Sequence, residues 1–133
     1  MSEDETLTFS KKERVCSKLL IDRLFSHGGS SSMSVYPLRL VFQQMERNEG
    51  EPSVMLLVSV PKRCFKRAVK RNRVKRQVRE VYRRNKHILS QVMDGRETKK
   101  LVMALIWLDD QLHETSDVER CVGLLMQRVV EKI

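Results

Sequence analysis

Apolar residues recur at helical spacing near both ends of this chain. Near the start they predict a helix over about residues 17–27, with Ser17 as its N-cap and Gly28 just beyond its end. Near the end they predict a helix over about residues 117–132 that begins at a capping box in residues 116–119. Its wide apolar stripe indicates packing on a sheet and contains Val118, Cys121, Val122, Leu125, Met126, Val129 and Val130.

A longer helix is predicted from about Ala68 onward. Its apolar seam has members spaced three, four or seven residues apart, namely Val74, Val78, Val81, Tyr82, Ile88, Leu89 and Val92. At about 100° per residue, one polar row lies opposite this seam: Asn72, Arg76, Arg79 and Arg83. Lys75 and Lys86 flank that row on one side and Arg73 on the other. We therefore expect one buried apolar face and one basic outer face.

Three other segments have the patterns of strands. Residues 35–44 alternate apolar and polar side chains, with Pro37 at the start or edge of the strand. Residues 54–60 are almost continuously apolar, which predicts a central strand buried on both faces. Residues 100–108 predict a third strand, in which Trp107 belongs to the core. The polar segment 45–53 is interpreted as a hairpin connection.

These elements predict an α+β fold, an α-β-β-α-β-α two-layer sandwich. The serine-rich segment 30–34 is interpreted as a loop, with a further short strand in 29–35 as the alternative. Because a strand, a long helix and a strand follow one another, the last two strands are candidates for parallel pairing. The length of 133 residues suits one domain, which we place at 9–133 after a flexible acidic tail at 1–8.

Charge changes this picture more than any other property. Residues 61–84 contain twelve lysines and arginines and one acid, Glu80, so this stretch carries +11 against +9 for the whole chain. The remaining residues are slightly acidic, and the sequence pI is near 9.8. Such concentrated charge favours a polyanionic partner, with nucleic acid as the first choice.

The charge alone indicates nucleic acid without specifying which kind, and three further interpretations of this stretch need to be compared with RNA binding. An ordinary solvated helix mixes charge signs to gain pairs one turn apart, whereas Arg76, Arg79 and Arg83 have only Glu80 nearby. A membrane-surface helix would carry large apolar residues opposite its charges, and here they are mainly valines. A DNA-reading helix is a further alternative, although the sequence has no helix-turn-helix pattern and no heptad zipper.

The sequence offers little chemistry of its own. The three cysteines lie far apart without a CxxC pair, which argues against a disulfide framework or a zinc site and fits a cytoplasmic protein. No apolar run is long enough to span a membrane, and the acidic N-terminus is no signal peptide. His113 and the other histidines are given no role, and the acidic cluster in 109–114 is interpreted as a polar loop. We predict no catalytic residue and no metal ligand.

The basic segment and its surroundings resemble one known family. A strand ending in VSVPKR (58–63) is followed by Ala68–Val69, then Arg71–Asn72–Arg73, Lys75–Arg76 and Arg79. The opening pattern of Phe9, Lys12–Glu13–Arg14, Leu24–Phe25 and Gly28 agrees with it. In these motifs, and over nearly its whole length, the chain resembles the protein subunit of bacterial ribonuclease P. Two departures are Ile21, where the family often has an aromatic residue, and one extra residue between Lys62 and Arg71.

The resemblance implies a fold like one domain of a ribosomal protein, with a left-handed crossover. It also implies that the protein binds a catalytic RNA, which cleaves the 5′ leader from precursor tRNA with the help of Mg²⁺. The protein itself would bind no cofactor and no membrane, and it would not form a protein oligomer in the functional complex. The alternative is a structural ribosomal or ribosome-assembly protein that binds RNA.

Two sets of site residues follow from position in the family's motifs and from the charge pattern. The RNA-binding set comprises Lys62, Arg63, Arg67, Arg71, Asn72, Arg73, Lys75, Arg76, Arg79 and Arg83. The set for a cleft that receives the leader, between the first helix and the sheet, comprises Ile21, Arg23, Phe25, Arg39 and Phe65. We expect strongly salt-dependent RNA binding.

Overall fold

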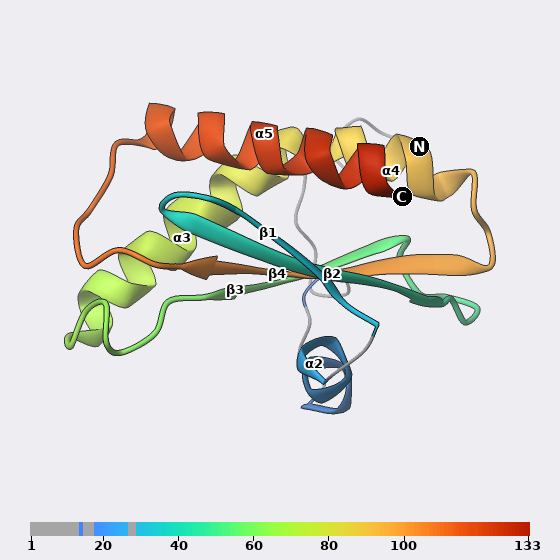
Figure 1. Cartoon of the computed structure of the whole chain (residues 1–133), viewed down its shortest axis with the longest axis horizontal. Coiled ribbons are helices and arrows are strands. Elements are labelled where there is room, and N and C mark those ends of the chain that lie inside the picture. Colours follow the sequence, from blue (N-terminus) through green and yellow to red (C-terminus); the bar gives the residue numbers. More distant parts are fainter. Residues whose placement is uncertain (1–13, 15–17, 27–28) are drawn as a thin grey trace.

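The computed structural model describes residues 14, 18–26 and 29–133 of the chain. Its elements, in chain order, are α2 (Lys18–Phe25), β1 (Ser31–Val35), β2 (Leu38–Glu46), β3 (Val54–Ser59), α3 (Ala68–Asn85), α4 (His87–Asp94), β4 (Lys99–Trp107) and α5 (Thr115–Lys132) (Figure 1). The predicted α+β class is confirmed. The structure adds one strand to the predicted order and divides its longest helix in two.

The four strands form one sheet in the order β1-β2-β4-β3. β3 and β4 are parallel, as the strand–helix–strand pattern predicted, and the other two pairs are antiparallel. The hairpin predicted for 45–53 is wrong, because β4 lies between β2 and β3. The connection instead passes the end of β4, where Arg47 N donates to Thr98 O and Leu101 N donates to Ser53 O. The handedness of the β3–β4 crossover stays a prediction.

β1 shows that the loop predicted for 30–34 is wrong and that the alternative of a short strand is correct. Despite three serines in five residues, β1 pairs with β2 from Ser31↔Phe42 to Val35↔Leu38. Met33 and Val35 are half-buried against the main core, so burial on one face stabilises a sequence with little intrinsic strand preference. Pro37 lies in the turn before β2 and follows a cis peptide bond.

β3 was predicted to be a central strand, and this is wrong, because β3 is at one edge of the sheet. Its predicted burial on both faces is confirmed. Leu56 and Val58 belong to the main core, and Met55 belongs to a smaller core on the opposite face. An isolated parallel bridge joins Leu56 to Arg14 on the outer side of the strand.

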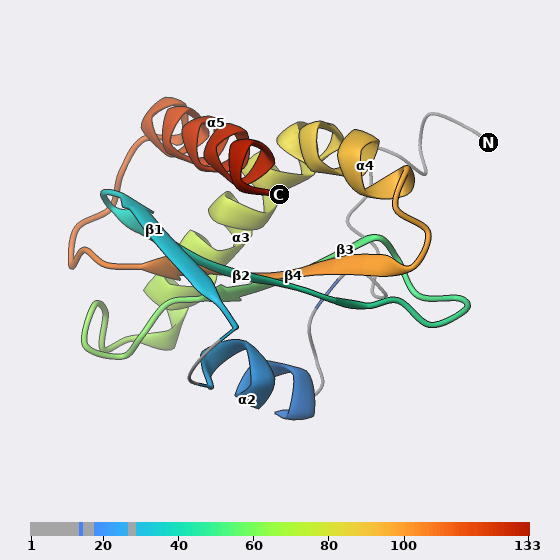
Figure 2. The ribbon, with the colours of Figure 1, turned by 45° about the vertical axis from the view of Figure 1, so that its right-hand side comes forward.

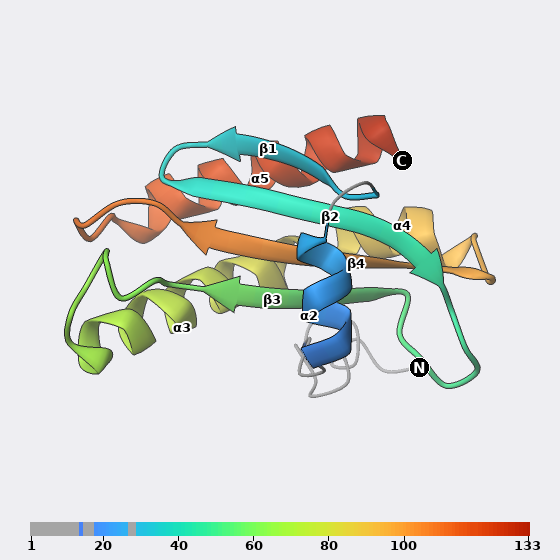
Figure 3. The ribbon, with the colours of Figure 1, turned by 60° about the horizontal axis from the view of Figure 1, so that its bottom comes forward.

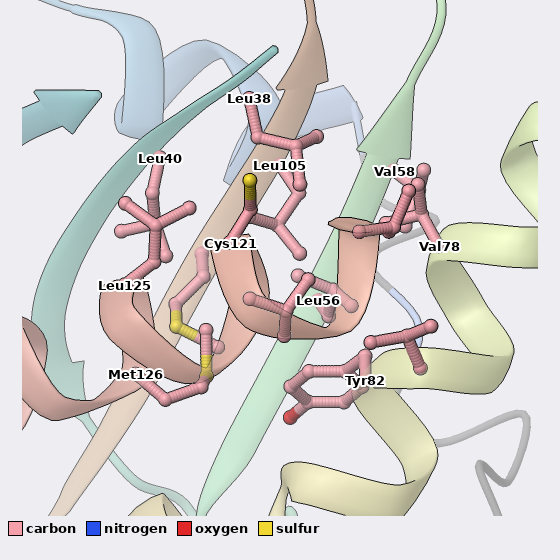
Figure 4. Close-up of a cluster of buried hydrophobic side chains, with 14 of the residues drawn as sticks. Leu38, Leu40, Leu56, Val58, Val78, Tyr82, Leu105, Cys121, Leu125 and Met126 are labelled. Atoms are coloured by element: carbon pink, nitrogen blue, oxygen red, sulfur yellow. The ribbon is translucent and has the colours of Figure 1, made fainter. Parts of the chain in front are cut away.

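The main core lies between one face of the sheet and the layer formed by α3, α4 and α5 (Figures 1 and 2). Figure 4 shows Val78 and Tyr82 of α3 beside Val58 and Leu56 of β3, with Leu125 and Met126 of α5 in the same core. The predicted seam is confirmed at its centre, because the side chains of Val74, Val78, Val81, Tyr82 and Leu89 are fully buried. Trp107 is likewise fully buried.

Both helix boundaries predicted in this layer need correction. The single long helix is interrupted at Lys86, a buried residue whose carbonyl accepts hydrogen bonds from Leu89 N and Ser90 N. The break starts α4, which turns Leu89 and Met93 into the core. The capping box at 116–119 is wrong because α5 begins at Thr115. Its N-cap is Glu114, which makes no side-chain capping hydrogen bond.

α2 covers the other face of the sheet and crosses its strands (Figure 3). Its fully buried Leu24 packs into the smaller core, with partners from three strands: Val41, Met45, Met55, Val102 and Ala104. The helix predicted over 17–27 is confirmed for 18–25. Its predicted caps, Ser17 and Gly28, lie outside the described residues, as does the predicted tail.

Candidate nucleic-acid interface

The cationic face is carried by α3, whose buried seam fixes the direction of every other side chain. Asn72, Arg73 and Arg76 are exposed, while Lys75 and Arg79 are partly exposed. Because the seam is anchored in the main core, the helix cannot turn its charges inward. The predicted basic outer face backed by a valine-rich face is therefore confirmed, except at Lys86, which was predicted to flank the basic row and is buried.

The start of α3 is electrostatically unusual. Its first turn contains no acidic residue, and its N-cap, Arg67, makes no side-chain capping hydrogen bond. The amino end of a helix carries partial positive charge, so cations such as Lys70 and Arg71 are unfavourable there, while an anion is favourable. This end of α3 is therefore suited to a negatively charged partner.

The loop between β3 and α3 presents further cations, and its own apolar residues hold it in place. Cys64 and Phe65 are buried in the main core, and Cys64 N donates to Pro61 O in a turn. Arg71 Nη1 donates to Phe65 O at 2.9 Å and to Lys66 O at 2.7 Å. Arg71 thus orders the loop. The exposed cations of the loop are Lys62, Arg63, Lys66 and Arg67.

Glu80 interrupts the positive charge of α3 at one point. Its carboxylate accepts from Arg83 Nε at 3.1 Å and from Arg83 Nη2 at 2.5 Å. This hydrogen bonding lowers the pKa of Glu80 and raises the pKa of Arg83. Glu80 therefore stays ionised near neutral pH, and the guanidinium of Arg83 is directed toward a partner on its own helix.

A groove of about 610 Å³ lies along α3 on the side that faces the start of α5. It is lined by Val69, Asn72, Arg73, Arg76, Gln77, Glu80 and Thr115. Gln77 Nε2 donates to His113 O at 2.9 Å and to Thr115 Oγ1 at 3.2 Å. These two bonds fasten α3 to the start of α5, so the groove runs along α3 and is bounded on its other side by Thr115. We call it the α3–α5 groove.

The loop before α5 is stabilised by a pair between His113 and Asp109. His113 Nε2 lies 2.6 Å from Asp109 Oδ2, and the histidine ring meets Trp107 and Tyr36 edge-on. The hydrogen bond from His113 holds the pKa of Asp109 below its usual value. The acidic cluster is therefore part of a polar loop, as predicted. In the described part of the chain, no group of three or more potential ligands could hold a metal ion.

The residues predicted to line a leader cleft do not share one surface. Ile21 is half-buried against the smaller core, and Phe25, one helical turn later, remains 46% exposed. Arg39 lies on the face of the sheet that α2 covers, because its neighbours Leu38 and Leu40 point into the main core on the other face. Its Nε donates to Ser32 Oγ at 2.9 Å. Arg23 is about 200° around α2 from Phe25.

Phe65 differs from the other predicted cleft residues. Its side chain is only 6% exposed and belongs to the main core, on the opposite face of the sheet from α2. The structure therefore places Ile21, Phe25 and Arg39 on the α2 side of the sheet and Phe65 under the cationic loop. An aromatic residue inside a basic loop can either contact RNA or hold the loop against the core. Because Phe65 is buried, it holds the loop against the core.

Sequence reasoning missed Gln77 and Thr115, which close the α3–α5 groove. Both are ordinary polar residues, and they are 38 positions apart in the chain. A signal for Gln77 does exist: it is one of only two uncharged polar side chains, with Asn72, between Lys70 and Arg79 of a helix rich in lysine and arginine. Thr115 carries no signal of its own, because its place depends on where α5 begins.

Fold and surface together define the class: a small α+β domain that presents a strongly cationic helix. The family model described as Ribonuclease P matches residues 9–114, so the chain belongs to the ribonuclease P protein family. It is 38% identical over 133 residues to the "Ribonuclease P protein component" of Porphyromonas gingivalis, covering 100% of this chain and 94% of that protein. The identity to the protein of the same name from Chlorobaculum tepidum is 32% over 112 residues, covering 80% and 71%.

Solved structures agree with this assignment at the level of the fold. The RNase P protein from Thermotoga maritima superposes with a TM-score of 0.59 at 22% identity, covering 84% of this chain and 90% of that one. The RNase P protein of Staphylococcus aureus gives 0.58 at 16% identity, covering 88% and 94%. As a ribonuclease P protein component, the chain is part of an endoribonuclease complex and takes part in tRNA processing. Among its described helices, none is long and apolar enough to cross a membrane.

Proposed function

We propose that this chain binds the catalytic RNA of ribonuclease P through α3 and the loop before it. The observation that carries the proposal is the anchored cationic face of α3, where Arg73 and Arg76 are exposed above a fully buried valine seam. Each phosphate that such a face neutralises releases condensed counterions, which supplies binding free energy and makes it salt-dependent. The uncapped, acid-free start of α3 supports the same partner.

The 5′ leader of precursor tRNA binds on the other face of the sheet in this proposal. Phe25 offers an exposed ring, Ile21 lies one turn before it, and Arg39 adds a cation from β2. A single strand without sequence preference is typically held by such a combination of stacking surface and positive charge. Phe65 has no part in this contact because it is buried on the opposite side.

The chain itself acts by binding and positioning. The hydrolytic step belongs to the RNA subunit and its Mg²⁺ ions, and the α3 face lowers the electrostatic repulsion between that RNA and its substrate. The two faces of the sheet would thus hold two RNA partners at once, the catalytic RNA at α3 and the leader at α2. The complex works in the cytoplasm and needs no second copy of this chain.

Reconstitution tests this proposal. The chain is added to the matching catalytic RNA and a labelled precursor tRNA at low Mg²⁺, and release of the 5′ leader is followed over time. We expect the chain to stimulate release strongly, because its cations replace part of the Mg²⁺ that screens the RNA phosphates. No stimulation, with RNA binding intact, would favour a structural ribosomal or ribosome-assembly role. Preferential competition by duplex DNA over structured RNA would contradict RNA recognition altogether.

A further inference from the structure

We infer that the α3–α5 groove receives an unpaired segment of RNA, with one nucleobase against Val69 and its phosphates beside Arg73 and Arg76. The inference rests on the proposed function, because it names what the cationic helix binds at this place. It goes further in assigning a concave site for single-stranded nucleotides, whereas a basic helix alone predicts only contact with phosphates.

The shape of the groove suits a short strand. Its α3 wall is built from residues on three successive turns, from Val69 to Glu80, which corresponds to roughly 16 Å along the helix axis at 1.5 Å per residue. Its volume of about 610 Å³ is in the range of about 300–1,000 Å³ typical of small-ligand sites. The second wall, at Thr115, makes the surface concave beside Gln77.

The chemistry of the lining changes along the groove. At one end, Val69 is an apolar side chain that is 80% exposed on the most cationic helix of the protein. In the middle, Arg73 and Arg76 provide positive charge, and the amides of Asn72 and Gln77 provide hydrogen-bonding groups. At the other end, the carboxylate of Glu80 is paired with Arg83, so this end is less positively charged than the middle. A ligand that fits this order has a flat apolar part next to an anionic part, as a nucleotide does.

An unpaired strand fits the groove better than a duplex does. In an A-form RNA helix the bases are stacked inside, so a protein meets mainly phosphates and 2′-hydroxyls on a broad surface. Such a surface could contact Arg76 but would leave Val69 against water or sugar. An unpaired nucleotide can instead turn its base toward an apolar side chain and stack on an arginine plane. Exposed Val69 therefore distinguishes the two ligands.

The test uses the full chain, and its groove variants leave every charge of the protein unchanged. Val69→Gln removes the apolar contact and Val69→Trp enlarges it, while Leu124→Gln and Leu124→Trp make the same changes at an exposed leucine of α5 outside the groove. The probes are a fluorescein-labelled oligouridylate and an RNA duplex of the same length. For the single strand we expect Val69→Gln to weaken binding about three- to ten-fold and Val69→Trp to strengthen it. Both Leu124 variants should bind like the wild type.

The outcomes separate this inference from the proposed function. Unchanged single-strand affinity in both Val69 variants, with weaker binding by Arg76→Ala/Arg79→Ala, would overturn the groove and leave the cationic helix as an RNA-binding face. Unchanged affinity in all of these variants would overturn both. An equal effect of Val69→Gln on duplex binding would overturn the choice of an unpaired strand. Displacement of the oligouridylate by polyglutamate at matched charge would overturn the assignment of RNA, because the groove would then accept any polyanion.

Discussion

α3 and α5 are two helices of the same length on the same face of the sheet, yet their charges differ greatly. Each has 18 residues and buries an apolar stripe in the main core. α3 contains eight basic residues and one acid, whereas α5 contains three of each. α5 also has an acid in its first turn and a base in its last turn, as the helix dipole favours, while the first turn of α3 has no acid.

Packing on the sheet does not account for the charge of α3. Because α5 packs on the same core with balanced charge, packing does not require a cationic helix. Concentrated positive charge instead opposes folding through self-repulsion and an unfavourable helix start. A feature that lowers the stability of the free chain points to a partner that removes the repulsion, and a polyanion does so. The following predictions test this difference between the two helices.

The largest expected effect is on RNA affinity. Arg76→Ala/Arg79→Ala should weaken binding to the catalytic RNA by about 30- to 100-fold, since two phosphate contacts are lost. Arg120→Ala/Arg128→Ala removes the same charge from α5 and should change affinity by less than about two-fold. Filter binding at constant salt measures both, with circular dichroism to verify the fold. Equal losses in the two double variants would remove the distinction between the helices.

Core packing should be equally sensitive in both helices. Val78→Ala in α3 and Val122→Ala in α5 each shorten a fully buried valine in the main core. We expect each to lower the free energy of unfolding by about 2 kcal/mol, through lost burial plus a small cavity. Urea denaturation of the RNA-free chain gives both values. A much smaller loss for Val78→Ala would mean that α3 is not held by its seam.

The loop before α5, to which Gln77 of α3 donates a hydrogen bond, should become less stable in acid. The pKa of Asp109 is lowered by its hydrogen bond from His113, so its stabilising effect is complete above the ordinary carboxyl pKa of about 4 and is lost as pH falls through the lower folded value. Asp109→Asn should lower the unfolding free energy at neutral pH by about 1 kcal/mol and flatten its decline in acid. Asp110→Asn, at the exposed neighbour, is the control. Parallel acid declines in the wild type and Asp109→Asn would contradict this assignment.

The smallest effects concern the helix dipoles. Lys70→Glu places an acid in the first turn of α3 and should stabilise the RNA-free chain by about 0.3–1 kcal/mol while weakening RNA binding. Asp117→Lys makes the reverse change in the first turn of α5 and should destabilise the chain by a similar amount without affecting RNA affinity. Thermal unfolding at low salt detects both. A destabilising Lys70→Glu would show that the start of α3 is already compensated within the chain.

Local patterns were sufficient to predict much of the fold. The seam of α3, the stripe of α5 and the burial of Trp107 all follow from periodicity, because each element must bury its apolar side chains. The sheet order does not follow from local sequence. Two apolar strands joined by a polar segment look like a hairpin, and only the insertion of β4 between β2 and β3 shows otherwise. The assignment of β1 as a loop or a strand was uncertain, because its serines have little strand preference and only its pairing with β2 makes it a strand.

The candidate site divides in the same way. The cationic row could be predicted because charge and helical phase are both visible in the sequence. The loop-ordering role of Arg71 and the anchoring role of Phe65 could not, since each depends on which carbonyls and side chains the fold brings near. The α3–α5 groove was invisible for the same reason, as its second wall comes from Thr115 at the start of a different helix.

The salt dependence of binding to the catalytic RNA tests the central claim most directly, because the slope of log affinity against log salt counts the phosphates that the protein neutralises. The wild type and Arg120→Ala/Arg128→Ala should give the same steep slope, and Arg76→Ala/Arg79→Ala should give a slope shallower by roughly one to two. The same slope for all three proteins would contradict the claim that α3 docks the chain on RNA.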